Sequence, residues 1–143
     1  MSLDVQVVTP ERILYTGEAA MVVARTLSGG DIAFLTGHAQ FLGALSVWPV
    51  RVKQEGGGEE AFAVHGGFVE VCDDTVSILS DVAEAAGQID VERAQRAKDR
   101  AAQAVRDAAG DEEALAAAEA ALRWAEVRIE VAALASTARG APH

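Results

Sequence analysis

The segment Ala85-Ala86-Gly87-Gln88-Ile89-Asp90 divides this chain of 143 residues into two parts of different composition. Six of the seven aromatic residues come before the segment, and only Trp124 follows it. Alanine shows the opposite bias, with 21 residues in 85–143 and 9 in 1–84. Because aromatic residues favour strands and alanine favours helices, the composition predicts a first part built of strands and a second part built of helices.

The same segment carries the signals of a domain boundary. Gly87 is typical of a break after the β region, and Asp90 is a good N-cap because its carboxylate can accept the free N–H groups of a starting helix. A chain of this length can bury roughly two thirds of its unfolded surface. We therefore expect an α+β protein with a β domain over residues 1–86 and an antiparallel helical hairpin over residues 87–143.

The first part has the pattern of short, half-buried strands. Leu3, Val5 and Val7 alternate with polar residues, which is the period-2 signal of a strand with one buried face. Further strand-like runs follow at short intervals, and we interpret the pair Gly66-Gly67 as a turn between two of them. Many short strands with regular turns favour an antiparallel sandwich or a flattened barrel.

The second part has two apolar stripes at helical spacing. Their members repeat every three or four residues and are Ala94, Ala97, Ala101, Ala104, Val105 and Ala108, then Leu115, Ala118, Leu122, Ala125, Ile129 and Ala132. Each buried CH₂ group stabilises by roughly 0.8 kcal/mol, so alanine offers little adhesion beyond its β-carbon. We therefore predict a hairpin that holds the β domain weakly, and both a permanently docked and a mobile hairpin remain open.

Charge and hydropathy exclude some classes of partner. The net charge is −10, of which residues 1–89 carry −8 and residues 90–143 carry −2. Phosphate repulsion then opposes binding to nucleic acid. No apolar run approaches the roughly 18 to 20 residues that span a bilayer, so we expect no direct membrane insertion. The chain is expected in the cytosol or at the periphery of a larger assembly.

The residue pattern gives little support for catalysis. No pair of His, Cys or carboxylate residues has metal-ligand spacing, and the serines lie outside the known nucleophile motifs. The glycine-rich stretches do not lead into helices, as a phosphate-binding loop would. We predict an interaction protein that is not an enzyme and requires no cofactor or metal, and the rival class is an enzyme with a site hidden in the sandwich.

Arginine is concentrated in the helical part. Five of these arginines form two groups, which are Arg93, Arg96 and Arg100, then Arg123 and Arg128. One interpretation is a solvated face whose arginines pair with neighbours such as Asp99 and Glu119. The other is a set of guanidinium groups that bind phosphates or an acidic protein surface.

Four motifs, taken in order, resemble those of a known family. They are Val8-Thr9-Pro10-Glu11-Arg12 with Tyr15-Thr16-Gly17, then Gly37-His38-Ala39, then Gly66-Gly67-Phe68-Val69-Glu70-Val71, and last Ile89-Asp90-Val91-Glu92-Arg93-Ala94. With this length and layout, the chain resembles the epsilon subunit of bacterial F-type ATP synthases over nearly its whole length. The family usually has proline on both sides of Gly-His-Ala, where this chain has Thr36 and Gln40, so a less rigid loop is expected.

The resemblance implies a fold, a location and partners. The fold would be a β-sandwich of about ten strands followed by the hairpin. The protein would be a non-catalytic rotor subunit of the central stalk, peripheral to the cytoplasmic face of the bacterial inner membrane. It would bind the gamma subunit and the c-ring and couple them during proton-driven ATP synthesis. The ring and gamma interface would include Asp31, Gly37, His38 and Ala39.

The resemblance also implies roles for the hairpin. In many members it extends toward the alpha and beta subunits and restrains ATP hydrolysis, and the contacts here would come from Arg93, Arg96, Arg100, Arg123 and Arg128. Some members bind ATP as a regulatory ligand, and the matching residues here are Glu84, Ile89, Asp90, Arg93, Ala94, Arg100 and Arg128. A third arginine of that motif is replaced by Trp124. The alternatives are an ATP-sensing module and a purely structural stalk subunit without inhibition.

Overall fold

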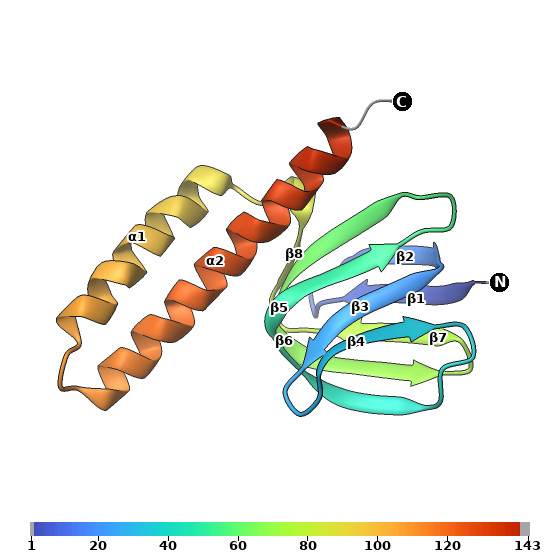
Figure 1. Ribbon diagram of the computed structural model, residues 1–143, viewed down its shortest axis with the longest axis horizontal. Coiled ribbons are helices and arrows are strands. Elements are labelled where there is room, and N and C mark those ends of the chain that lie inside the picture. Colours follow the sequence, from blue (N-terminus) through green and yellow to red (C-terminus); the bar gives the residue numbers. More distant parts are fainter. Residues whose placement is uncertain (1, 141–143) are drawn as a thin grey trace.

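A β-sandwich and a two-helix hairpin make up the computed structural model, which describes residues 2–140 (Figure 1). The predicted α+β fold is therefore confirmed, and residues 141–143 of the expected hairpin domain lie outside the described residues. The strands are β1 (Leu3–Val8), β2 (Ile13–Ala19), β3 (Met21–Thr26), β4 (Gly30–Leu35), β5 (Phe41–Lys53), β6 (Glu59–Cys72), β7 (Thr75–Leu79) and β8 (Ala83–Ala85). A short 3₁₀ helix, η1 (Ala86–Gln88), leads to α1 (Val91–Asp107) and α2 (Glu112–Gly140).

The strands pair in the order β2-β1-β7-β6-β5-β3-β4, and β8 adds to β6. All neighbours are antiparallel except β1 and β7, which are parallel. The described residues hold eight strands rather than about ten. One reason is that the chain continues through Gly66-Gly67 as a single strand, β6, instead of turning there. The two segments of β6 then pair with different neighbours, residues 62–64 with β8 and residues 68–72 with β7.

The core of the sandwich is filled by the inward positions of these strands. The fully buried large side chains include Leu3, Phe34, Phe62 and Ile78, together with many valines. Burial of each such side chain stabilises by roughly 1.5–3 kcal/mol, so this core accounts for a rigid β domain.

Capping residues define the two helices. The Asp90 carboxylate accepts a hydrogen bond from the Arg93 N–H at 3.0 Å, as expected of an N-cap. Asp111 caps α2 in the same way, with its Oδ1 3.1 Å from the Ala114 nitrogen. Several predicted stripe residues are buried, namely Ala94, Ala101, Ala108, Ala118 and Ala125. These small side chains let α1 and α2 lie close together as the predicted hairpin.

The hairpin is docked, and α2 lies between α1 and the sandwich (Figure 1). A second apolar cluster joins the two parts and comprises Ala61, Ala63, Ala86, Ile89, Val127 and Val131, with Trp124 packed against it. Val127 and Val131 face the sandwich and not the alanine stripe, so α2 has a second apolar side. This second side is absent from the predicted stripes, and it anchors the docked hairpin better than alanine alone would allow.

Candidate functional site

The β4–β5 loop holds three of the four residues expected at the ring and gamma interface. Gly37 has a φ of +87°, a backbone conformation that favours glycine. The His38 Nδ1–H donates to the Ala39 carbonyl oxygen at 2.8 Å, because a carbonyl can only accept. The imidazole also lies edge-on to the buried Phe34 ring, with 5.0 Å between centroids. These contacts hold the loop against the end of the sandwich.

The fourth expected residue, Asp31, lies at the opposite end of β4 from this loop. Its carboxylate accepts two hydrogen bonds from the Arg25 guanidinium, at 2.8 and 3.2 Å. These bonds favour the charged forms, so the pKa of Asp31 is lowered and the pKa of Arg25 is raised. The Arg25 guanidinium stacks 3.7 Å from the centre of the Trp48 ring. The structure therefore does not bring Asp31 together with Gly37, His38 and Ala39.

Part of the expected nucleotide site gathers where β8, η1 and α2 meet. The Arg128 guanidinium forms a bidentate salt bridge with Glu84, at 2.6 Å for Nε–Oε1 and 3.3 Å for Nη2–Oε2. Ile89 is buried in the adjoining apolar cluster. The others lie on or beside α1, where Asp90 is the N-cap, Ala94 is buried, and Arg93 and Arg100 are exposed. Only Glu84, Ile89 and Arg128 are thus brought together around the docked α2.

The five hairpin arginines do not form one surface. Within the described part of the chain, Arg93, Arg96 and Arg100 are exposed on α1 and make no salt bridge, with Asp99 or any other residue. Arg123 is instead 5.2 Å from the Trp48 ring of the sandwich, measured from Cζ to the ring centre, and Arg128 is held by Glu84. The α1 group is therefore available to a partner, whereas the α2 group is engaged in the docked state.

A feature that the sequence analysis missed is an apolar row on the outer face of the sandwich. The strand register places its members side by side on successive strands, and we define the apolar row as Leu27, Ala44, Phe68, Leu79, Val8 and Ile13. Leu27, Phe68, Leu79 and Ile13 are 46–72% exposed. The sequence does carry a signal for the apolar row, because its apolar residues occupy strand positions that face outward, where polar side chains are usual. The signal cannot be used from sequence alone, because the strand register decides which positions face outward.

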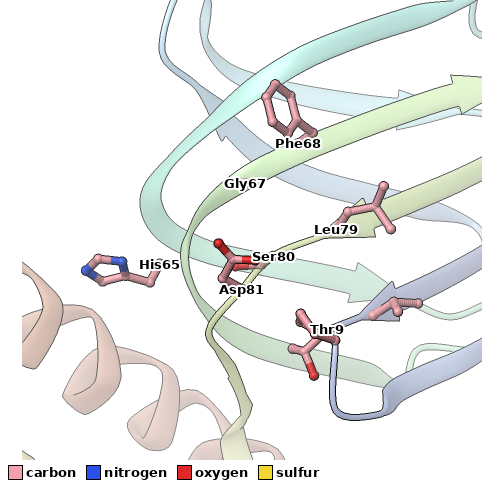
Figure 2. Close-up of a pocket in the computed structure, with 9 residues that line it drawn as sticks. Thr9, His65, Gly67, Phe68, Leu79, Ser80 and Asp81 are labelled. Atoms are coloured by element: carbon pink, nitrogen blue, oxygen red, sulfur yellow. The ribbon is translucent and has the colours of Figure 1, made fainter.

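The middle of the apolar row borders a groove of about 340 Å³. Its walls come from the β1–β2 turn, from β6 and from the end of β7, and the lining residues are Val8, Thr9, Pro10, His65, Gly67, Phe68, Leu79, Ser80 and Asp81 (Figure 2). Figure 2 shows Phe68 and Leu79 on adjacent strands and His65 directed toward the helical hairpin. There the His65 ring lies edge-on to Trp124, with 5.0 Å between centroids. His65 thus lies between the groove and the middle of α2.

Gly67 lines this groove where β6 and β7 lie against each other. Its φ is +115°, and a Cβ on this residue would lie 2.1 Å from the Leu79 carbonyl oxygen. Only glycine allows β6 and β7 to approach so closely at the point where β6 bends.

The described residues contain no group of three or more His, Cys, Asp or Glu side chains placed to hold a metal ion. None of their helices has both the length and the hydropathy that a membrane span requires.

Comparison with known proteins agrees with this architecture. Residues 2–86 match the family described as ATP synthase, delta/epsilon chain, beta-sandwich domain, and residues 88–133 match the corresponding long alpha-helix domain. The ATP synthase epsilon chain of Shouchella clausii is 42% identical over 92% of this chain and 95% of its own length. That of Brevibacillus brevis is 50% identical over 69% of this chain and 74% of its own length.

Solved structures show the same fold. A chain of the mitochondrial ATP synthase of Euglena gracilis superposes with a TM-score of 0.77 at 25% identity, covering 92% of this chain and 81% of that one. A chain of the Tetrahymena thermophila central stalk and c-ring assembly has a TM-score of 0.51 at 17% identity, which bears on the fold alone. Both domains and nearly the full length are thus matched, and the chain belongs to the epsilon-chain family of the ATP synthases.

Proposed function

We propose that this chain is a non-catalytic rotor subunit that couples the c-ring to the gamma subunit in the central stalk, peripheral to the cytoplasmic face of the bacterial inner membrane. Membership of the epsilon-chain family supports this role, and the similar Euglena gracilis chain comes from an assembly that includes F1 and a c-ring. The observation that carries the proposal is the apolar row, because an isolated protein gains nothing by exposing four large apolar side chains on one line.

The apolar row is the surface that gamma covers in this proposal. Its side chains come from five successive strands and from the turn after β3, so they are held rigidly and need no ordering on binding. Acidic residues border it, with Asp81 in the groove and Glu70 two positions along β6 from Phe68. The complementary gamma surface would therefore be apolar with basic residues at its rim.

The c-ring contact would use the opposite end of the sandwich from the hairpin. Gly37, His38 and Ala39 lie in the β4–β5 loop, which Leu35 and Leu42 flank with exposed side chains. Asp31, at the far end of β4, would make a separate contact with gamma or with the ring. The backbone and His38 of this loop can form hydrogen bonds with polar loops of the ring, and the exposed leucines on either side can pack against it.

Replacing Phe68 with glutamate is expected to weaken binding to gamma at least tenfold. The substitution removes roughly 1.5–3 kcal/mol of apolar burial and adds a charge at the centre of the apolar row. The measurement is co-purification with gamma, followed by titration of the purified pair. The matched control is Val91→Glu, because Val91 is also about half exposed (49%) but lies on α1. Equal binding by the two variants would contradict the assignment of the apolar row.

We also propose that the hairpin restrains ATP hydrolysis through Arg93, Arg96 and Arg100, which have no salt bridge in the described part of the chain and can pair with acidic surfaces of alpha and beta. Arg123 and Arg128 would join them only after α2 leaves the sandwich. Deletion from Asp90 onward is expected to raise ATP hydrolysis by the assembled complex several-fold while assembly is kept. Unchanged hydrolysis would contradict the restraining role and would favour the alternative, a purely structural stalk subunit.

A second candidate function is ATP sensing by the docked hairpin, favoured by the junction of Glu84, Ile89 and Arg128. A phosphate would have to compete with the Glu84 carboxylate for the Arg128 guanidinium, so binding is expected to be weak. Calorimetry with Mg-ATP is expected to give a signal only near millimolar nucleotide, and Arg128→Ala is expected to abolish it. No heat with the unmodified chain at that concentration would reject this function.

A further inference from the structure

The β4–β5 loop is tied to the neighbouring β6–β7 turn by an acidic side chain. The Asp74 Oδ1 accepts a hydrogen bond from the backbone N–H of Gly37 at 2.7 Å, across 37 residues of sequence. A carboxylate acceptor at this distance makes a charge-assisted hydrogen bond, which is stronger than one between neutral groups. Both segments lie at the end of the sandwich away from the hairpin (Figure 1).

The turn that presents Asp74 has an unusual backbone. Asp73 and Asp74 have φ values of +49° and +59°, a pair typical of a type I′ turn between two antiparallel strands. Glycine or asparagine would satisfy this backbone with less strain than aspartate. The Asp74 carbonyl oxygen also accepts the Asp4 N–H at 2.9 Å, which fixes the turn to β1. The backbone of the turn therefore holds the Asp74 side chain in a position from which it can reach the Gly37 amide of the loop.

A second contact holds the other end of the same loop. The Gln40 Nε2 lies 3.4 Å from the Cys72 Sγ at the end of β6, so both ends of residues 37–40 contact the β6–β7 hairpin. Between these two contacts, the His38 ring packs edge-on against Phe34 and donates a hydrogen bond to the Ala39 carbonyl oxygen. Two of the contacts that hold the loop therefore come from residues far from it in sequence, Asp74 and Cys72.

We propose that Asp74 is a positioning residue that presents Gly37, His38 and Ala39 to the rotor ring. The residue does not itself have to touch the ring. It acts by holding the Gly37 amide, which reduces the number of loop conformations before binding and so reduces the entropy lost on contact. The expected effect of Asp74 on ring affinity rests on the proposed ring contact, whereas the effect of Asp74 on the loop can be measured in the isolated chain.

The experiment compares three variants of the full chain. Asp74→Gly removes the acceptor while keeping a residue suited to the positive φ. Asp73→Gly is the matched control, because it removes the same charge from the neighbouring position of the same turn, and the Asp73 carboxylate accepts from the Cys72 Sγ and not from the Gly37 amide. Asp74→Asn keeps an oxygen acceptor and tolerates the left-handed backbone, so it is the conservative rescue. The readouts are the hydrogen-exchange rate of the Gly37 amide by NMR and the affinity for the purified c-ring.

Asp74→Gly is expected to raise the Gly37 exchange rate roughly five- to tenfold, as loss of one hydrogen bond predicts, and to weaken ring binding by a similar factor. Asp73→Gly should change neither quantity, and Asp74→Asn should restore most of both. Equal Gly37 exchange in the two glycine variants would overturn the inference, and so would a loosened loop with unchanged ring affinity. His38→Ala separates the two proposals, because a normal affinity there would instead show that the loop does not contact the ring.

Discussion

Gly67→Ala is expected to destabilise the β-sandwich by about 3 kcal/mol or more. Two costs add at this position. A φ of +115° is strained for any residue with a Cβ, and the new Cβ would lie 2.1 Å from the Leu79 carbonyl oxygen and 2.9 Å from the Ser80 Cα. Both obstacles are backbone atoms, so β6 and β7 can relieve the overlap only by separating.

Thermal or urea unfolding of the purified chain measures this effect. Gly57→Ala is the matched control, because Gly57 also has a positive φ, of +101°, but lies in an exposed turn where no atom beyond its two chain neighbours comes within 4 Å of the added Cβ. The control should cost only the backbone term, roughly 1–2 kcal/mol. If the two variants unfold at the same denaturant concentration, then the close approach of β6 and β7 at Gly67 does not add to the cost of the substitution. Loss of the groove beside Phe68 should accompany the larger effect, and gamma binding would then fall as well.

The domain layout could be predicted from sequence because its signals are local. The alternation at Leu3, Val5 and Val7, the N-cap at Asp90 and the alanine spacing each depend on a few neighbouring residues. The strand count could not be predicted in the same way. Glycine pairs are common in turns, and only the pairing of β6 with β5 along its whole length shows that Gly66-Gly67 bends a strand without ending it.

The sites were harder to predict because they depend on register and on contacts between distant residues. Asp74 reaches Gly37 across the sandwich end, and nothing in either local sequence indicates the contact. The same holds for the apolar row, whose members are spread from Val8 to Leu79 and become neighbours only in the folded sheet. The resemblance to a family supplied Glu84 and Arg128 as members of one site, and the structure pairs them with each other.

Val127→Asp is expected to release the hairpin from the sandwich while both parts stay folded. Val127 is 1% exposed in the cluster that joins α2 to Ala61 and Ala63 of β6. A carboxylate there loses its hydration, which shifts the docking equilibrium by roughly 3 kcal/mol, or about a hundredfold, toward the undocked form. Aspartate in the middle of α2 costs less than about 1 kcal/mol in helix propensity, so the helix itself should persist.

Small-angle scattering and tryptophan fluorescence measure the release. The radius of gyration should rise, and the combined emission of Trp48 and Trp124 should shift to the red, because Trp124 leaves His65 and Trp48 loses Arg123. Ala117→Asp is the control, because Ala117 is exposed on the same helix and accepts the charge without meeting the sandwich. A compact Val127→Asp chain with unchanged fluorescence would show that the valines do not hold the hairpin.

The same variant distinguishes the two roles proposed for the hairpin. If the undocked hairpin restrains the catalytic head, Val127→Asp should lower ATP hydrolysis by the assembled complex, opposite to the rise expected on deletion from Asp90. Release also frees Arg123 from Trp48 and Arg128 from Glu84, so all five arginines become available to acidic surfaces at once. Release without any change in hydrolysis would indicate that the hairpin is only a structural element of the stalk, because its five arginines would then be available and would still not restrain hydrolysis.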